Sequence, residues 1–501
     1  MVLESLEPKI VWQIFEKVFI QTPRPSKKED KIRAKIKEYV KAESEGAGIP
    51  ISISEDDTGN ILVKARATKG MEKAPSILLQ GHMDMVCETD RPDGFDFDNN
   101  PIPVRIQDNG EWVDADGTTL GADNGIGSSI GLALVLDSEV AHGPLEVLIT
   151  VDEETGLVGA FGLDLEELGI ESKLMINIDS EDLGVITIGS AGGGDSTLTK
   201  NLSLKDVKGE ATFFDLTVSG LFGGHSGVDI HEPRANANKL IARMLTLIVE
   251  KMNVHLCSWN GGSKHNAITR ESTAKFAVET GRAAETENLL EEARGAILAY
   301  YKSDAPGSIP LEPDIRIEWK VSEPAPAFSL EESKKIIQSV NVIPHGPIRF
   351  SPSVEGLVET SNNLAIIKTE DAEISVLMST RSSVDSELAS FRKMISDLAA
   401  LSGWEVAQKA AYPGWNPEPK SPFLAYVRSH LEKVSDGGVK VEAIHAGLEC
   451  GIIGAKIPGI QMVSIGPRME NPHTPDERVR IADVGTLYDV MKSILKDLPN
   501  L

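Results

Sequence analysis

The segment Leu78-Leu79-Gln80-Gly81-His82-Met83-Asp84-Met85 ends an apolar run with a histidine and a carboxylate two residues apart. In a β-strand, residues i and i+2 point to the same face. If residues 76–80 form a buried strand of an α/β sheet, His82 and Asp84 emerge together at its carboxyl end, where such sheets place their ligand sites. One imidazole nitrogen can then bind a metal while the carboxylate orients the ring. Taken alone, the pattern is more typical of an ordinary loop histidine than of a metal ligand.

The sequence around this segment, from residue 51 to about residue 188, alternates short apolar β-like runs with helical ones. This order predicts an α/β domain whose sheet is at least partly parallel. After about residue 189 a looser rhythm indicates two similar αβ units packed as one inserted domain. Past residues 412–415 the alternation returns, and we expect this last segment to rejoin the first sheet. The predicted domains are residues 1–187 and 408–501, which form the catalytic domain, and residues 188–407, which form the insert.

The individual elements follow from apolar periodicity. We expect a first helix within residues 1–17. Strands are predicted at residues 61–63, 76–79, 145–151, 174–178, 212–219, 273–279, 315–321, 354–360, 374–380, 439–444 and 461–464, and further helices at residues 235–252, 286–301, 385–401, 422–434 and 484–498.

Composition limits the class of protein. The chain has 501 residues, of which 41% are hydrophobic and 25% are charged. This length and composition are typical of a soluble globular protein of two or three domains. No apolar run approaches the roughly 20 residues that cross a bilayer, and the first residues lack the pattern of a signal peptide. A formal charge of −26 disfavours nucleic acid and anionic membranes as partners. Three widely spaced cysteines argue against a disulfide framework and favour a cytoplasmic setting.

Four further motifs each end or follow an apolar run. They are Leu120-Gly121-Ala122-Asp123-Asn124-Gly125, Asp152-Glu153-Glu154-Thr155-Gly156, Asp179-Ser180-Glu181 and Pro472-His473-Thr474-Pro475-Asp476-Glu477. Two histidines, two aspartates and at least one glutamate at strand ends or in loops are a suitable ligand set for a pair of divalent cations. A free acidic residue beside such ions supplies a general base. Each motif by itself is also typical of a solvated turn, so the prediction depends on their joint occurrence.

The order of these motifs resembles a known group of enzymes. GHMD, GADNG, DEETG, NIDSED, GGHSG and PHTPDE occur here as they do in the co-catalytic zinc aminopeptidase, carboxypeptidase and aminoacylase superfamily. Within it, the chain looks most like the aminoacyl-histidine (Xaa-His) dipeptidases. That closer resemblance extends over essentially the whole chain and is carried by residues 223–227, 236–240, 411–415 and 445–451.

The resemblance implies a fold and a metal site. The fold is a phosphorylase/hydrolase-like three-layer αβα catalytic domain with an inserted lid domain of two similar α+β units. Asp123 is expected to bridge two zinc ions, and the Asp123–Asn124 peptide to be cis. The other implied ligands are His82 and Asp179 for one ion, and Glu154 and His473 for the other. Glu153 is the implied general base for a metal-activated water, and Asp84 orients His82. Cobalt or manganese could replace zinc in such a site.

The resemblance also implies how a peptide is recognised. His225, in Gly223-Gly224-His225-Ser226-Gly227, is the expected donor to the oxyanion. Arg381 is suited to bind a free carboxylate, and Asn266 is the expected amide partner. An exposed arginine at a strand end is the structural alternative for Arg381. The implied partners are a small peptide and, as a homodimer, a second copy of the chain.

Two other functions stay open at this point. One is an N-acyl-amino-acid deacylase of the same superfamily, with the same metals and a different pocket. The long insert favours the dipeptidase, because the deacylases generally carry one shorter unit. The other is a metal-free binding protein on the same fold, against which the intact ligand set and the intact Glu153 argue.

Overall fold

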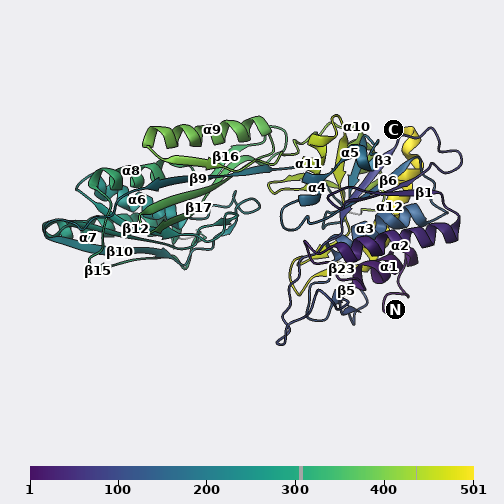
Figure 1. The fold of residues 1–501 in the computed structure, drawn as a ribbon, viewed down its shortest axis with the longest axis horizontal. Coiled ribbons are helices and arrows are strands. Elements are labelled where there is room, and N and C mark those ends of the chain that lie inside the picture. Colours follow the sequence, from purple (N-terminus) through teal and green to yellow (C-terminus); the bar gives the residue numbers. More distant parts are fainter. Residues whose placement is uncertain (304–308, 436) are drawn as a thin grey trace. The chain divides into compact units, whose positions relative to one another are not determined.

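The computed structural model describes residues 1–303, 309–435 and 437–501. The chain divides into two compact units (Figure 1). Unit 1 comprises Met1–Gly189, Trp415–Ala443 and Leu448–Leu501, and unit 2 comprises Ser190–Gly414 and Ile444–Gly447. Compared with boundaries predicted after residues 187 and 407, the chain changes unit after Gly189 and Gly414, and it returns briefly to unit 2 at Ile444–Gly447.

Unit 1 is built on one eight-stranded sheet. Its strands, in spatial order, are β1 (Ile51–Glu55), β2 (Ile61–Ala65), β6 (Leu145–Thr150), β3 (Ile77–His82), β7 (Leu174–Asn177), β21 (Gln461–Ser464), β8 (Val185–Ser190) and β20 (Lys440–Ile444). Strand β3 runs parallel to both β6 and β7, and β21 runs parallel to β7. The predictions of a partly parallel sheet, and of a C-terminal segment that rejoins it, are therefore confirmed.

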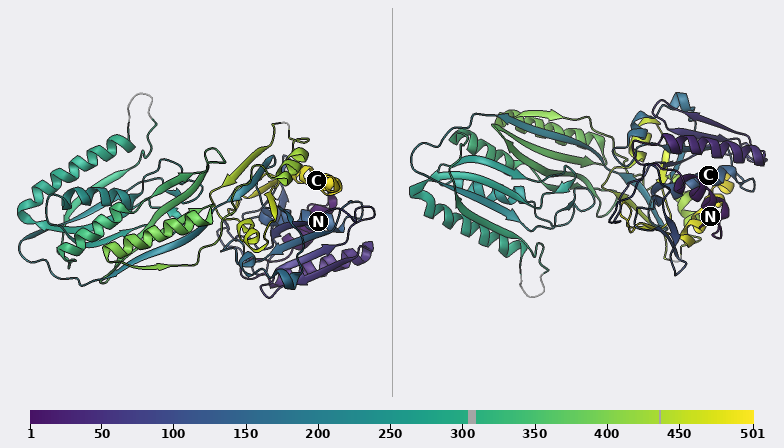
Figure 2. Two further views of the ribbon diagram at one scale, coloured as in Figure 1. Left: turned by 90° about the horizontal axis from the view of Figure 1, so that it is seen from above. Right: turned by 60° about the horizontal axis from the view of Figure 1, so that its bottom comes forward.

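Helices cover both faces of this sheet, because its central strands are apolar on both faces. Leu79 and Val147 belong to a core that also contains residues of α1 (Lys9–Ile14), α2 (Asp30–Ala47), α3 (Ala122–Leu136), α10 (Pro422–Leu431) and α12 (Ile481–Asp497). Leu78 and Leu148 point to the opposite face and are also fully buried, on the side of α4 (Val158–Gly162), α5 (Leu165–Leu168) and α11 (Glu449–Lys456). Unit 1 is accordingly a three-layer αβα structure (Figure 2).

A second, smaller sheet in unit 1 was not predicted. It contains four short strands in the order β22 (Met469–Glu470), β23 (Arg478–Arg480), β5 (Trp112–Ala115) and β4 (Val104–Ile106). The loop between β22 and β23 carries His473, which has a left-handed backbone (φ 59°). This sheet therefore fixes the His473 loop beside a segment more than 350 positions earlier in the sequence, through pairs such as Arg478 with Asp114.

Unit 2 is one nine-stranded sheet with helices packed on a single core. The order is β15 (Arg316–Ser322), β10 (Ala211–Ser219), β14 (Ser272–Glu279), β12 (His255–Gly261), β17 (Val358–Glu370), β18 (Glu373–Ser382), β9 (Gly192–Asn201) and β19 (Glu405–Gln408), with β16 (Gly346–Phe350) also paired to β17. The helices are α6 (Ala237–Val249), α7 (Ala283–Tyr301), α8 (Leu330–Val342) and α9 (Asp385–Ser402). The two predicted αβ units thus share one sheet, which joins them where β12 pairs with β17.

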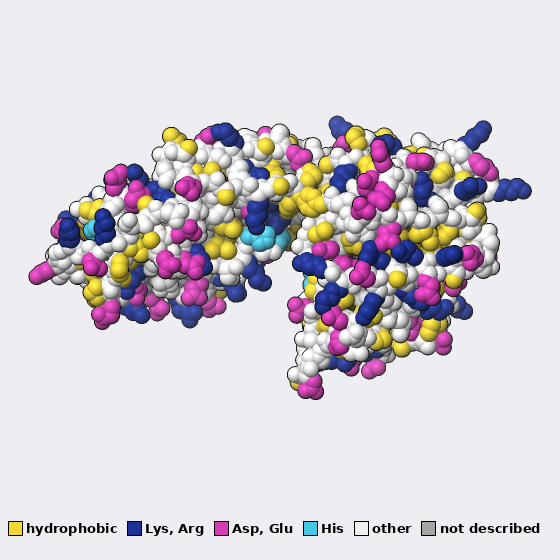
Figure 3. Space-filling model, in the orientation of Figure 1, with side chains coloured by type: hydrophobic (Ala, Val, Ile, Leu, Met, Phe, Trp, Pro, Cys, Tyr) yellow, Lys and Arg dark blue, Asp and Glu magenta, His cyan; other side chains and the backbone are white. Residues whose placement is uncertain are grey.

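One strand prediction is wrong at its start, and the predicted first helix is confirmed with a different extent. The strand predicted at residues 354–360 begins only at Val358, because Gly356 has a left-handed backbone (φ 75°) and ends the extended run. The helix predicted within residues 1–17 is α-helical only from Lys9 to Ile14 and continues as a π-helix from Phe15 to Ile20. Among the described residues, none of the helices is long and apolar enough to cross a membrane. In Figure 3, acidic and basic side chains are interspersed on the visible face of each unit.

Candidate metal centre

The predicted ligands converge at one edge of the unit 1 sheet. His82 is the last residue of β3, Glu154 follows β6, and Asp179 follows β7. Because β3, β6 and β7 are adjacent and parallel, their carboxyl ends meet at the same edge. Asp123 lies in the first turn of α3, and His473 comes from the β22–β23 loop.

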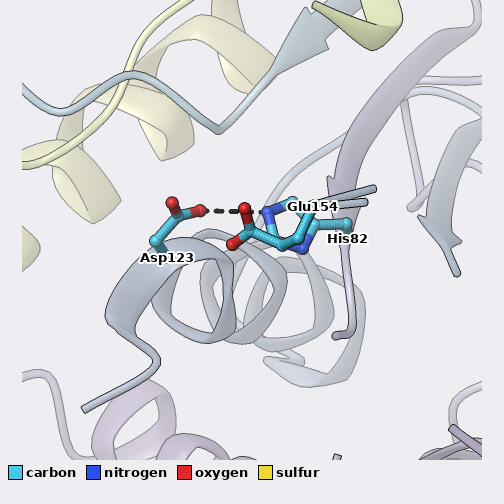
Figure 4. Close-up of side chains that lie close together, drawn as sticks. All are labelled: His82, Asp123 and Glu154. Atoms are coloured by element: carbon cyan, nitrogen blue, oxygen red, sulfur yellow. Dashed lines mark hydrogen bonds and ion pairs between the residues drawn. The ribbon is translucent and has the colours of Figure 1, made fainter. Parts of the chain in front are cut away.

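Asp123 lies at the centre of this group, and each of its carboxylate oxygens faces a different histidine. Its Oδ1 is 2.9 Å from His82 Nε2 (Figure 4). Its Oδ2 is 3.1 Å from His473 Nε2. Asp179 Oδ1 is 3.5 Å from His82 Nε2, and Glu154 Oε2 is 3.0 Å from His473 Nε2. The five side chains therefore form two triads that share Asp123.

This geometry fits two cations. Nitrogen and oxygen ligands of a tetrahedral zinc, with bonds of about 2.0–2.1 Å, lie about 3.3 Å apart. The four distances within the triads, from 2.9 to 3.5 Å, are close to that value. Within the described part of the chain, Glu154 Oε1 and Asp179 Oδ1 are buried without a hydrogen-bond partner. Unpartnered buried acceptors are costly unless a cation or donor satisfies them, so the residues present suit the metal pair that the resemblance implies.

The pKa shifts of these residues also favour the binding of cations. Burial, followed by the like charges of neighbouring carboxylates, raises the pKa of Asp179 and of Glu153 well above their usual range. Hydrogen bonds to Asp123 and Glu154 raise the pKa of His473 to about 11. Cations would therefore relieve repulsion among the carboxylates, and their binding must displace a proton from His473.

Asp84 supports this centre from beneath. Its Oδ1 is 3.2 Å from His82 Nδ1, opposite the nitrogen that faces Asp123. The same carboxylate accepts hydrogen bonds from the backbone N–H groups of Glu153 (3.1 Å) and Glu154 (3.3 Å) and from the Ser26 hydroxyl (2.8 Å). The Asp84 carboxylate thus lies against the His82 ring and also holds the loop that carries both glutamates.

Replacement Asp84→Asn should weaken metal binding without abolishing it. The amide preserves the shape of the side chain but removes the charge that orients His82, and residues in this position typically contribute 10–100-fold to metal affinity. Chelator competition on the purified protein should therefore report an affinity lower by about 10–100-fold. Wild-type affinity in this variant would show that Asp84 does not support the ligands.

Three charged residues beside the centre were missed from the sequence. Glu449, in the first turn of α11, is 1% exposed, and its Oε2 accepts hydrogen bonds from Thr150 (2.7 Å) and from Gln80. Its Oε1 has no hydrogen-bond partner among the described residues, and burial raises the pKa of Glu449 to about 7. Glu477 and Arg24 are also buried nearby. A charged residue at the head of an apolar helix was the available signal for Glu449; the other two bind backbone groups, which leave no side-chain pattern.

The residues predicted to contact substrate lie in unit 2. His225 is in the short strand β11 (Gly224–His225), which pairs with β13 (Ala267–Ile268), and Asn266 directly precedes β13. The Nδ1 of His225 accepts hydrogen bonds from the backbone N–H groups of Val228 (3.0 Å) and Gly227 (3.3 Å). Burial, and then the charge of Arg381, lowers the pKa of His225.

Arg381 lies within β18 and is 7% exposed, so the alternative of an exposed arginine at a strand end is wrong. Its Nη1 donates to the Tyr412 hydroxyl (3.2 Å). In the described part of the chain its Nε is buried and has no acceptor. A buried guanidinium with a spare donor is suited to bind an anion such as a carboxylate.

Comparison with known proteins finds a peptidase family and individual peptidases. The family model described as Peptidase family M20/M25/M40 matches residues 78–497. The cytosol non-specific dipeptidase of Escherichia coli is 37% identical over 497 residues, which cover 99% of each chain. The crystal structure of aminoacylhistidine dipeptidase from Vibrio alginolyticus matches with a TM-score of 0.90 at 36% identity, over 100% of this chain and 98% of that one. A tripeptidase from Staphylococcus aureus shares the fold, with a TM-score of 0.54 at 15% identity over 99% of this chain and 100% of that one. By the extent of the family match and by its likeness to these relatives, the chain belongs to Peptidase family M20/M25/M40.

Proposed function

We propose that this chain is a two-metal dipeptidase that hydrolyses unblocked dipeptides, Xaa-His among them. The observation that carries the proposal is the pair of triads that share Asp123, next to Glu153, whose carboxylate interacts electrostatically with His82, Glu154 and Asp123. The names of the Escherichia coli and Vibrio alginolyticus relatives support the class of substrate. Zinc is the proposed metal because the ligands are imidazoles and carboxylates. Cobalt or manganese could bind to the same side chains.

Glu153 is the proposed general base. A bound pair of cations lowers the pKa of a water molecule and polarises a carbonyl group. Glu153 follows strand β6 beside the proposed ligand Glu154, and its backbone is held by Asp84. Burial raises the pKa of the Glu153 carboxyl, and a carboxylate with a raised pKa is a better proton acceptor. It would take the proton of the attacking water and pass it to the leaving amine.

The substrate would be held by groups of unit 2. Arg381 is proposed to bind the free carboxylate of the dipeptide, because its guanidinium is buried and one nitrogen lacks an acceptor. His225 is proposed to donate to the oxyanion of the tetrahedral intermediate, and Asn266 to bind an amide of the substrate. Burial, and then the nearby charge of Arg381, lowers the pKa of His225 and so favours the neutral ring, which donates through one nitrogen.

The setting and assembly are part of the same proposal. The Escherichia coli relative is named a cytosol enzyme, which supports a cytoplasmic location, as do three cysteines that form no disulfide. We propose a homodimer on the resemblance to the dipeptidases alone.

A turnover panel tests this function. The purified chain, loaded with zinc, is given Xaa-His dipeptides, other dipeptides, tripeptides and N-acetyl amino acids, and release of amino acid is followed. We expect turnover of the unblocked dipeptides, including Xaa-His, and about two metal ions per chain by elemental analysis. Hydrolysis of the N-acetyl amino acids alone would assign a deacylase instead. A chain that binds no metal and is fully active in chelator would refute the two-metal mechanism.

A further inference from the structure

The segment that carries the proposed bridging ligand Asp123 is held by a buried glutamate from the His473 loop. Glu477 is 2% exposed, and its Oε2 accepts hydrogen bonds from the backbone N–H groups of Leu120 (2.7 Å) and Gly121 (2.8 Å). Its Oε1 accepts a third from the backbone N–H of Asp123 (3.2 Å). Because Glu477 lies four residues after His473, it joins the loop of one proposed ligand to the backbone of another.

A buried arginine holds the same segment through its carbonyl groups. Arg24 is 1% exposed, and its Nη2 donates to the carbonyl of Gly121. Its Nη1 donates to the carbonyls of Met83 (3.0 Å) and Asp84 (2.8 Å), in the loop that follows His82. The planar fork of a guanidinium can bridge several acceptors at once. Arg24 thereby joins the loop after His82 to the segment before Asp123.

The glycines of this segment make room for the guanidinium. A Cβ atom at Gly121 would lie 2.2 Å from Arg24 Nη2, and one at Gly125 would lie 2.8 Å from it. Gly121 also has a left-handed backbone (φ 70°), which glycine adopts without strain. The close approach of Arg24 therefore accounts for Gly121 and, together with Phe15, for Gly125.

Charge at both positions calls for an explanation beyond packing. Buried charged groups are costly, and apolar residues of similar volume would often fill such space with no loss of stability. Charged groups form hydrogen bonds that are stronger than those of neutral groups. Glu477 accepts such bonds from the backbone N–H groups of Leu120–Asp123, and Arg24 donates one to a carbonyl of the same segment. Both the donors and an acceptor of this peptide segment are therefore bound.

We propose that Arg24 and Glu477 are positioning residues that hold the backbone of Leu120–Asp123 so that Asp123 reaches both histidines. The proposal rests on the proposed two-metal function, and it assigns neither residue a contact with metal or substrate. Glu477 fixes the distance from Asp123 to the His473 loop, and Arg24 fixes the distance to the loop after His82. The spacing of the two cations would follow from these two distances.

The test is a cobalt-loaded Glu477→Gln variant of the full chain. An amide presents an N–H₂ group to backbone donors, so it cannot accept all three hydrogen bonds. We expect affinity for Co²⁺ to fall by about 10–100-fold in chelator competition, the visible absorption of bound Co²⁺ to change, and kcat to fall more than KM changes. Arg24→Lys should give a smaller change of the same kind, because an ammonium presents its N–H groups from one nitrogen and cannot reproduce the planar fork of the guanidinium. The combined variant should show less than the product of the two separate effects, because both residues act on one segment.

Glu146→Gln is the matched control. Glu146 is also in unit 1 and is 1% exposed, and its carboxylate accepts the backbone N–H groups of Glu171 (3.2 Å) and Ser172 (3.1 Å). It lies in β6 at the end of the strand remote from Glu153. This control should lower Tm but leave the Co²⁺ spectrum and affinity unchanged.

A lower Tm with wild-type Co²⁺ affinity and spectrum in Glu477→Gln would overturn the proposal and leave Glu477 a structural role alone. If that variant does not fold, Glu477→Asp keeps the charge, and it should retain the two ions with a weakened affinity; wild-type affinity there would equally overturn the proposal. Failure of the proposed two-metal site is distinguishable, because the wild-type chain would then bind no metal pair. Failure of the proposed substrate class alone is also distinguishable, because the turnover panel detects it while Co²⁺ binding by the wild-type chain is retained.

Discussion

Glu153→Ala should keep two metal ions per chain and lose turnover by about 10²–10⁴-fold in kcat. The expected result follows from position, since Glu153 lies beside the two triads without belonging to either. Removal of its carboxylate deletes the proton acceptor and deletes no proposed ligand. It also removes a negative charge that lies close to the carboxylates of Glu154 and Asp123. Because the repulsion among these carboxylates falls, metal affinity should stay the same or increase.

The measurement combines elemental analysis of the purified variant with steady-state kinetics on an Xaa-His dipeptide. Glu166→Ala is a suitable control, because Glu166 is an exposed glutamate of the same unit, in α5, and its loss should leave kcat unchanged. Near-wild-type turnover in Glu153→Ala would show that another group takes the proton. Loss of the metal ions in that variant would make Glu153 a ligand.

Asp123→Ala should remove both ions, whereas Asp179→Ala and Glu154→Ala should each remove one. The reason is that the two oxygens of Asp123 face different histidines, while Asp179 Oδ1 is 3.5 Å from His82 Nε2 and Glu154 Oε2 is 3.0 Å from His473 Nε2. Ligand atoms of His82, Asp123 and Glu154 also lie within 4.8 Å of one another, so Glu154→Ala tests which ion depends on Glu154. Loss of the metal pair removes water activation worth several kcal/mol. At about 1.4 kcal/mol for each factor of ten, the rate should fall by about 10³-fold or more.

Metal content per chain, measured at matched protein concentration after dialysis, distinguishes these variants. Far-UV circular dichroism would show whether each variant keeps its secondary structure. Two ions retained in Asp123→Ala would contradict the bridging role. Loss of both ions in Asp179→Ala and Glu154→Ala alike would indicate that the two sites fill together and are not independent.

The sequence predicts the larger sheet and the proposed ligands for one reason. A buried parallel strand is an apolar run, and its carboxyl end is where polar residues follow, so β3, β6 and β7 and the side chains after them can be found in one pattern. The convergence of His82, Glu154 and Asp179 then depends only on these strands being neighbours.

The parts that escaped prediction lack such a pattern. Strand β17 continues through the polar residues 359–363, which are buried because their side chains bond to neighbouring elements, as Asn362 does to Thr380 (2.9 Å). Glu477 and Arg24 bind peptide groups, which every residue carries, so no residue type marks their partners. The strands β22 and β23 contain two and three residues, too few for periodicity to indicate a strand.

The small sheet of β4, β5, β22 and β23 has a consequence for the time at which the enzyme becomes complete. His473 is carried by a hairpin whose partner strand, β5, lies more than 350 positions earlier in the sequence and is therefore made first. A nascent chain can pair β4 with β5 early, but β5 gains its second neighbouring strand only after β23 has been made. Until then, one triad lacks its histidine, and Glu477 has not yet bound the segment before Asp123. A ribosome therefore adds His473 after the other four proposed ligands, and a partly made chain carries an incomplete set of them.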